Sequence, residues 1–280
     1  PYIPIIHLLV RLSQRQRFDR IWQEYRVQEG PAARVAQHEE GRARFLRLLN
    51  DYVRAADPRT IVEVGCGSAI DLCLLQSLVP SVRAMGLDVS FPGLQVAQTS
   101  AEHLHVPLHL CQGDAFTIPL RSGMAGLVFS QGVLEHFDDP RRALAEQARV
   151  LAPGGVLVVS VPQTFTGYTL HKHKAIRAGT WLWGWEGQFS SRTLCSLGRE
   201  VGLEVERVFG YQYWLSWAEP TWVLRDLVGK VERRLPAVLS KWVKPVSRAY
   251  DRFWNRVEES YGHAFLLNVA AVFRTKGSRR

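Results

Sequence analysis

The feature that most constrains the fold is a regular alternation, between residues 60 and 161, of short apolar segments with segments of helical periodicity. The apolar segments have the length of buried strands. Parallel strands need a crossover connection, usually a helix, so this order predicts an α/β fold: a parallel sheet with helices on both faces. The predicted strands are 60–64, 84–89, 108–112, 125–130, 155–161, 203–208 and 265–274, and the helices are 71–78, 92–103, 140–150 and 191–201.

The remaining segments divide the chain into parts. Apolar residues recur at helical spacing before residue 57 and again after residue 211, where the stretches 223–235 and 246–257 are amphipathic and end near Pro236 and Gly262. The predicted division is an N-terminal helical segment 1–57 (helices 5–26 and 33–55), an α/β domain formed by 58–210 and 263–280, and a helical insertion 211–262 that acts as a lid or substrate region.

Composition excludes several other classes of protein. The 280 residues are 46% apolar and carry a net charge of +9, with the basic residues toward the two ends and an acidic centre. The four cysteines show no zinc-type spacing, so we expect reduced thiols and no metal site. No apolar run reaches the roughly 20 residues that span a bilayer. The first residues lack initiator Met and signal-peptide features. A cytoplasmic protein is predicted.

The strongest local signal is the sequence Ile61–Leu72, in which a buried strand runs through a glycine-rich turn into a helix. Glycine lets the backbone turn tightly and lets a ligand approach where a Cβ would clash. A dinucleotide fold would place a third glycine in this turn, at the position of Ile70, which fits that fingerprint poorly.

Further turns follow the other predicted strands. Asp88 ends the second strand and can accept hydrogen bonds from both ribose hydroxyls of an adenosine, and Asp114 follows the third, within reach of an adenine amino group. The fourth strand leads into Gln131 and Gly132, and Pro153–Gly155 precedes the fifth. Ligands of open α/β sheets bind outside the carboxyl ends of the strands, so these turns predict one shared site.

As a set, these motifs resemble the class I S-adenosylmethionine-dependent methyltransferases, in particular the small-molecule branch that includes ubiquinone and menaquinone biosynthesis enzymes. The resemblance covers roughly 58–210 and the closing strand. It implies a Rossmann-like, seven-stranded, mostly parallel sheet sandwiched by helices, with a helical insertion before the last strand. It also implies S-adenosylmethionine as cofactor, bound by Glu63, Gly65, Gly67, Asp88, Val89, Asp114, Ala115 and Gln131.

This sequence departs from the family at two places: Ala69 stands where glycine is usual, and the insertion is unusual, so the family does not identify the acceptor. Each acid also has a purely structural interpretation. Glu63 can be a strand-end acid paired inside the fold, Asp88 a helix cap before Pro92, and Asp114 a cap of its own turn.

Methyl transfer is an in-line displacement, so the protein mainly positions the nucleophile, and an alcohol or carbon acid also needs a base. Glu135 and His136 follow the fourth strand and are the candidate catalytic residues. Alternatively, His136 only caps the following turn. His171 and His173, with Lys172 and Lys174, lie in a polar loop after the fifth strand, where a solvated basic face is the favoured interpretation.

The tryptophans lie outside the predicted sheet, and those after residue 180 fall in 171–190 and 211–262. We expect these two segments to cover the acceptor pocket. Tryptophan with arginine and lysine suits a small-molecule or lipid-like acceptor and a peripheral contact with the inner face of the membrane. An RNA methyltransferase and a non-catalytic cofactor-binding protein are the alternatives; no RNA-binding appendage or amino-methylating motif favours nucleic acid. The oligomeric state is not predicted.

Overall fold

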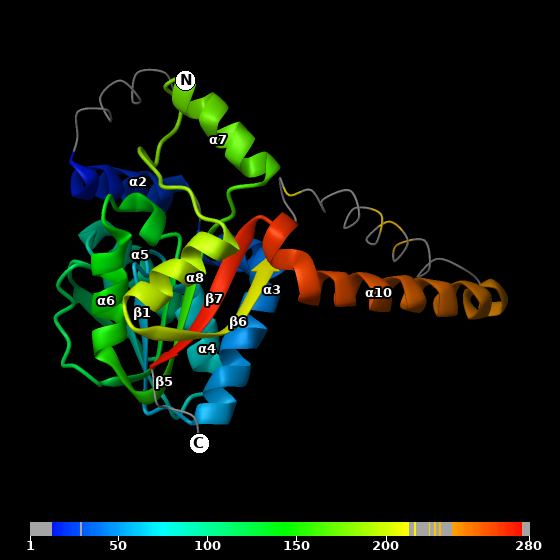
Figure 1. Cartoon of the computed structure of the whole chain (residues 1–280), viewed down its shortest axis with the longest axis horizontal. Coiled ribbons are helices and arrows are strands. Elements are labelled where there is room, and N and C mark those ends of the chain that lie inside the picture. The colour runs from blue at the N-terminus through cyan, green and yellow to red at the C-terminus, as the bar shows by residue number, and fades with distance from the viewer. Residues whose placement is uncertain are drawn as a thin grey trace.

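The computed structural model describes residues 13–28, 30–212, 216, 224, 227, 230 and 237–275. Its centre is a seven-stranded sheet in the order β3-β2-β1-β4-β5-β7-β6 (Figure 1). The first five strands along the chain pair with one another in parallel, and β7 runs antiparallel to both β5 and β6. The strands are β1 (Thr60–Val64), β2 (Arg83–Asp88), β3 (His109–Gln112), β4 (Ala125–Gln131), β5 (Leu151–Pro162), β6 (Leu203–Tyr211) and β7 (Asn268–Thr275). The predicted mostly parallel α/β sheet is confirmed.

Alternation along the strands explains why both faces are covered. Ile61 of β1 packs into one apolar cluster, whereas Val62 and Val64 point to the opposite face and join a second. Three helices contribute to the first cluster: α3 (Pro31–Ala56), α4 (Ile70–Leu78) and α5 (Phe91–Leu104). The second is completed by α6 (Pro140–Val150) and α8 (Ser191–Glu200).

The region after β5 differs from the prediction. Residues 167–177, part of which was expected as a polar loop, form the helix α7 (Gly167–Arg177). The hydroxyl of Thr166 caps this helix by accepting from the Thr169 N–H, a local signal that the polar composition obscured. Figure 1 shows α7 and α2 (Gln14–Gln28) at the same end of the molecule.

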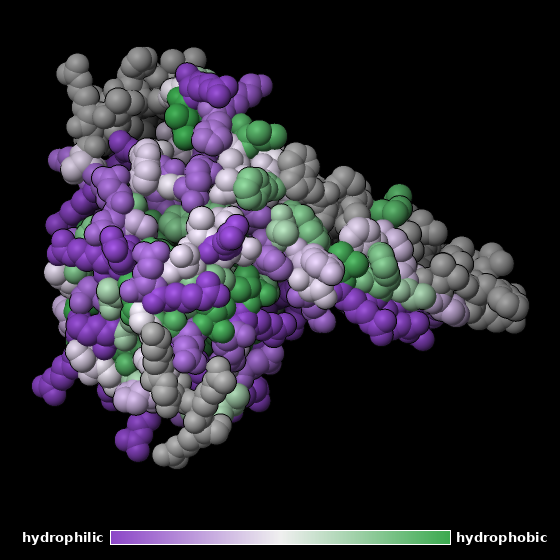
Figure 2. Space-filling view, in the orientation of Figure 1, coloured by the Kyte–Doolittle hydropathy of each residue, from purple (hydrophilic) through white to green (hydrophobic). Residues whose placement is uncertain are grey.

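The described part of the insertion is one long helix, α10 (Ala237–Phe265), which contains Pro245 and projects away from the sheet (Figure 1). Gly262 was expected to end it but lies inside it. A Cβ on Gly210 of β6 would stand 2.2 Å from the Gly262 carbonyl oxygen, so glycine here permits close helix–strand contact. In Figure 2, hydrophilic residues gather along one edge of α10 and apolar residues along the other. The predicted stretch 223–235 lies largely outside the described residues.

Candidate active site

The carboxyl ends of the parallel strands border a cavity of about 580 Å³, within the range of small-molecule pockets. Its lining includes every residue predicted for cofactor binding or catalysis: Glu63, Gly65, Gly67, Asp88, Val89, Asp114, Ala115, Gln131, Glu135 and His136. These residues, separated by up to 73 positions between Glu63 and His136, therefore meet at one place. The expectation was wrong for Pro153–Gly155, which lies near the amino end of β5 and does not line the cavity.

The glycine-rich turn has a left-handed backbone at every second residue, at Gly65, Gly67 and Ala69. Gly65 and Gly67 have φ angles of +68° and +48°, and the Gly65 N–H donates to the Leu87 carbonyl at 2.7 Å, which ties the turn to β2. Ala69, at φ +51°, precedes the first residue of α4. A Cβ is strained in this region, so the departure from glycine at Ala69 is tolerated at a cost in stability.

Asp88 is buried at the end of β2 and is fixed by the backbone. Its Oδ2 accepts from the Gly67 N–H at 2.7 Å and its Oδ1 accepts from the Ser90 N–H at 2.8 Å. Burial raises the pKa of this carboxyl, while the two backbone bonds oppose that shift. The N-cap of α5 is Ser90, which accepts from Gly93, so Asp88 is not itself the helix cap.

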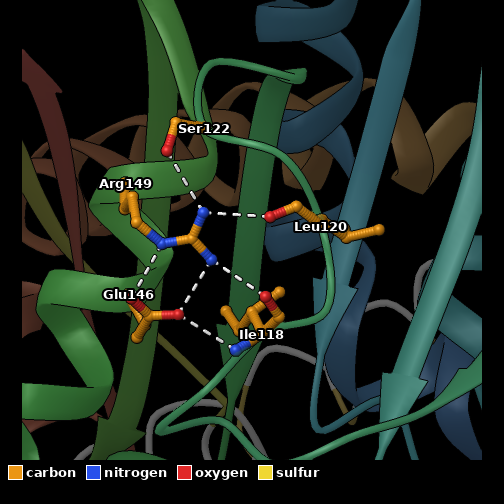
Figure 3. A network of polar contacts seen from close by, with 5 residues as sticks. All are labelled: Ile118, Leu120, Ser122, Glu146 and Arg149. Carbon is orange, nitrogen blue, oxygen red and sulfur yellow. Dashed lines mark hydrogen bonds and ion pairs between the residues drawn. The ribbon is translucent and has the colours of Figure 1, made fainter.

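Asp114 is exposed and does cap its own turn, because its Oδ1 accepts from the Phe116 N–H at 2.8 Å. It nevertheless lines the cavity beside the buried Ala115. Side chains of α6 hold the segment that follows Asp114 in place (Figure 3). There Arg149 donates to the carbonyls of Ile118 and Leu120 and pairs with Glu146.

A chain of hydrogen-bonded side chains fixes Gln131 at the end of β4. Its amide nitrogen donates to Asp71 Oδ2 and its Oε1 accepts from the Tyr211 hydroxyl at 3.0 Å. That hydroxyl lies 2.7 Å from Ser160 Oγ. Glu63 is buried at the end of β1 and lines the same cavity. Asp71, Ser160 and Tyr211 were not predicted as site residues, since nothing in the sequence links them to Gln131.

Glu135 and His136 lie in a single 3-10 turn after β4, Leu134–His136. Glu135 is buried, and burial followed by the nearby Glu186 raises its pKa to about 8. Burial lowers the pKa of His136. The imidazole meets the ring of Phe18 edge-on, with centroids 5.1 Å apart, and lies 6.3 Å from the ring of Trp183.

A buried ion pair adjoins these two residues. Lys172 of α7 is 2% exposed and its Nζ lies 3.0 Å from Glu186 Oε2. The other carboxylate oxygen of Glu186 accepts from Trp181 Nε1 at 3.1 Å. The expected solvated basic face is therefore wrong for Lys172, because α7 turns this side chain inward. It holds for His171, His173 and Lys174, which are exposed.

The roof of the cavity comes from segments far apart in sequence. Trp183 and Glu186 line it, as expected for 171–190, but so do Phe18 and Trp22 of α2, which were not predicted. A Cβ on Gly67 would stand 2.2 Å from the Trp22 ring, so the indole rests directly on the glycine turn. No described residue of α10 lines the cavity.

This strand order, with one antiparallel strand, a glycine turn after β1 and an acid ending β2, defines the class I methyltransferase fold. Residues 62–159 match the family model of a methyltransferase domain. An uncharacterized 37.1 kDa protein in transposon TN4556 of Streptomyces fradiae is 36% identical over 119 residues, 42% of this chain and 34% of that protein. Malonyl-acyl-carrier-protein O-methyltransferase of Hahella chejuensis is 34% identical over 119 residues, 42% of either chain.

Demethylmenaquinone methyltransferase of Thermus thermophilus is 30% identical over 116 residues, 41% of this chain and 53% of that enzyme. This chain therefore spans about half or less of the length of these curated relatives. Within the described residues, no helix combines the length and apolarity needed to cross a membrane.

Solved structures share the fold at low identity. An S-adenosylmethionine-dependent methyltransferase from Thermotoga maritima has a TM-score of 0.53 at 20% identity, covering 71% of this chain and 84% of its own. The cyclase SpnF also has a TM-score of 0.53, at 17% identity, covering 83% of this chain and 80% of its own. These likenesses show the fold alone, and the same fold hosts different reactions.

Residues 62–159 thus match a methyltransferase domain, and the chain has the fold of S-adenosylmethionine-dependent methyltransferases.

Proposed function

We propose that this chain transfers a methyl group from S-adenosylmethionine to a small-molecule or lipid-like acceptor. The observation that carries the proposal is the cavity in which ten residues from four strand ends meet. Relatives named as methyltransferases of malonyl-acyl-carrier protein and of demethylmenaquinone support an acceptor of this kind.

Residues of the cavity are proposed to bind different parts of the cofactor. Gly65 and Gly67 offer backbone without a Cβ, and Asp88 is the acid that would hold the ribose. Asp114 and Ala115 would border the adenine, while Glu63 and Gln131 would face the methionine part. When bound, the cofactor supplies an electrophilic methyl group. The protein contributes orientation and exclusion of water, since the reaction needs the acceptor in line with the breaking bond.

Glu135 and His136 are proposed to act on the acceptor. Depression of the His136 pKa keeps the imidazole neutral at neutral pH, so it can accept a proton. Glu135, with a pKa of about 8, is a neutral acid there and can donate a hydrogen bond. Aromatic side chains complete this half of the cavity, namely Phe18, Tyr168, Trp183 and Tyr211, and they suit an acceptor with an apolar body.

Calorimetry tests the proposal. S-adenosylhomocysteine should bind and NAD should not, and at a hundredfold excess over Kd it should stabilise the fold by roughly 3 kcal/mol. Absence of binding would refute the proposal. Release of S-adenosylhomocysteine in the presence of an acceptor would exclude the alternative of a cofactor-binding protein without turnover.

We also propose a peripheral contact with an anionic membrane surface through α10, which we treat, with the rest of 211–262, as an insertion on the α/β domain. Lys244, Arg248, Arg252 and Arg256 recur every fourth residue and are exposed. Like charges at this spacing weaken an isolated helix, so an anionic partner would relieve the repulsion. Phe253, 59% exposed, adds an apolar side chain of the kind that enters a lipid interface.

Flotation with vesicles tests this contact. Vesicles containing phosphatidylserine should carry the protein and pure phosphatidylcholine vesicles should not, and the double variant R248E/R252E should stay behind. The variant R192E/R199E changes the net charge equally on the exposed surface of α8 and should still float. Equal flotation of both variants, or binding of RNA that R248E/R252E abolishes while flotation is absent, would refute the membrane contact.

A further inference from the structure

The Lys172–Glu186 pair lies beside the proposed catalytic residues although the sequence does not connect them. The two charges are 3.0 Å apart, and both side chains are almost fully buried, at 2% and 3% exposure. The backbone joins the pair to the 3-10 turn, because the Gly187 N–H donates to the Glu135 carbonyl at 2.5 Å. Glu186 itself lines the cavity.

Two buried polar atoms next to this pair lack hydrogen-bond partners in the described part of the chain: Glu135 Oε2 and His136 Nδ1. The backbone of Trp185 also acts on the imidazole and raises the His136 pKa, which is the effect of a carbonyl that accepts from the ring; we assign this interaction to Nε2, because Nδ1 has no partner among the described residues. In the neutral ring Nε2 then carries the proton and Nδ1 keeps its lone pair. A buried acceptor without a donor is costly, which indicates a ligand group that is expected to fill this role.

We propose that the buried Lys172–Glu186 pair is a positioning unit that sets the proton affinity of His136 and Glu135 toward an acceptor bearing a hydroxyl or amine hydrogen. The inference rests on the proposed methyl transfer and deepens it by naming the class of acceptor. Lys172 and Glu186 act through their charges and need not touch the reacting atoms.

The step balances with this chain's residues. The acceptor's oxygen or nitrogen lone pair forms the bond to the methyl carbon, and the carbon–sulfur bond breaks with its electron pair going to sulfur. The acceptor's hydrogen passes as a proton to His136 Nδ1. Glu135, protonated below about pH 8, can donate a hydrogen bond to the acceptor and hold it in place.

The two charges act on the catalytic residues in opposite directions. Glu186 raises the pKa of both His136 and Glu135, and Lys172 lowers both. Arg17 of α2 also lowers the pKa of His136, and the Tyr168 phenol beneath Lys172 Nζ stays neutral, since burial raises its pKa. As long as the pair is intact, its opposing effects partly cancel.

The pairing also bears on which acceptor fits. Glu186 already neutralises Lys172, so this pair offers no spare positive charge to a carboxylate, although Arg15 of α2 also lines the cavity. A carboxylate would instead lie beside the acids Glu135 and Glu186. A hydroxyl or amine supplies the hydrogen that Nδ1 lacks and leaves no uncompensated charge.

Histidine NMR titration tests the charge effect without requiring activity. The His136 resonance is assigned as the one missing in His136→Gln. We expect its pKa to fall by about one unit or more in Glu186→Gln and to rise by a similar amount in Lys172→Met. The double variant K172M/E186Q should return close to the parent value, and Lys174→Met, exposed on the same helix, should leave it unchanged.

Opposite shifts separate this role from a merely structural one, which would perturb both single variants alike. Shifts of the same sign, or none, would overturn the inference. If a single variant does not fold, the double variant, which buries no unpaired charge, still decides: a His136 pKa far from the parent value contradicts cancellation. The affinity for S-adenosylhomocysteine should stay within a few-fold of the parent value in all these variants. If the parent protein itself does not bind S-adenosylhomocysteine, methyl transfer is refuted, whereas the titration result still stands.

Probe molecules test the acceptor class. Phenol, aniline and benzoate, matched in size, are titrated into the parent protein with S-adenosylhomocysteine present, and the His136 resonance is followed. Phenol and aniline should move it more than benzoate. A larger effect of benzoate would overturn the assignment to hydroxyl and amine acceptors, and no effect of any probe would show that the cluster does not meet the acceptor.

Discussion

The two halves of the cavity are built in different ways. In the half proposed to bind the cofactor, the main chain places the groups: Asp88 is held by the N–H groups of Gly67 and Ser90, and Asp114 by that of Phe116. In the acceptor half, side chains from α2, α7 and the turn after β4 are buried together, and Glu135 and His136 each retain a buried polar atom without a partner.

This difference matches the two proposed tasks of the cavity, which are to bind a common cofactor and to bind a particular acceptor. A turn fixed by backbone hydrogen bonds binds the same cofactor whatever the acceptor is. The shape and chemistry of a pocket of buried side chains can change with a few substitutions. Such a pocket can also hold titratable groups in protonation states that they would not adopt in water, which catalysis can use. The cofactor half should therefore respond to mutation through binding and stability, and the acceptor half through pH dependence.

The largest effect is expected from Asp88→Ala. Two buried N–H groups would lose their acceptor, which should lower the free energy of unfolding by about 2–4 kcal/mol. Cofactor affinity should fall on the order of a hundredfold, since the ribose loses a charged acceptor, and Asp88→Asn should be milder. Urea unfolding and calorimetry measure the two effects. The exposed Asp138→Ala is the matched control. Parental behaviour of Asp88→Ala would remove Asp88 from the cofactor site.

Glu135→Gln should change how stability depends on pH. With a pKa of about 8 against 4.5 unfolded, the folded Glu135 keeps a proton that the unfolded chain releases. Its contribution is full below pH 4.5 and is lost as the pH rises to 8, by at most about 1.4 kcal/mol per unit. Urea unfolding at pH 5 to 8 should show the parent losing stability relative to the variant. Parallel curves, as expected for the exposed control Glu200→Gln, would show that Glu135 is ionised throughout.

Arg149→Ala should lower stability and cofactor affinity although Arg149 does not line the cavity. The substitution removes the hydrogen bonds to the carbonyls of Ile118 and Leu120, at about 1–2 kcal/mol in unfolding free energy. The partly exposed pair with Glu146 contributes little of this. Cofactor affinity should fall a few-fold, because 113–116 precedes the released segment. The exposed Arg141→Ala on the same helix controls for charge; equal affinity in both variants would make the Arg149 network irrelevant to the site.

The smallest effect is a gain in stability. Ala69→Gly relieves the left-handed strain at φ +51° and should raise the free energy of unfolding by about 0.5–1 kcal/mol. Ala101→Gly, inside α5, should lower it by about as much. Thermal unfolding checks both, and a loss of stability in Ala69→Gly would mean that the Ala69 methyl group packs more favourably than its backbone is strained.

The sequence predicted the fold well because its signal is local and repeated. Strand β1 was predicted at its observed bounds and α6 likewise, since apolar runs and Pro140 mark them plainly. Helix α7 was missed because its apolar periodicity is weak and its histidines and lysines suggested a loop. Helix α10 was predicted too short, as 246–257, partly because Gly262 was taken as a stop, whereas Gly262 makes a close contact with β6 that only the tertiary structure reveals.

The site was predictable to a similar extent. Gly67, Asp88 and Gln131 follow strands, so topology alone brings them to one edge. Lys172 and Glu186 have no such marker: their pairing depends on which side of α7 faces inward and on the path of the chain back to residue 186. The available signal was that no acid occurs between Glu146 and Glu186. An acid that is buried on its own needs a nearby cation.

Trp22 lies against the glycine turn that is proposed to bind the cofactor. Its indole rests on Gly67, so no ligand atom fits between them, and the nucleoside half cannot reach that backbone until α2 shifts. Helix α2 is fastened near one end by the bond from Gln14 to the His136 carbonyl and near the other by the bond from Arg26 to Gln95. If the proposed cofactor contacts Gly67, its entry and departure would require α2 to move, and these two hydrogen bonds would then oppose that movement.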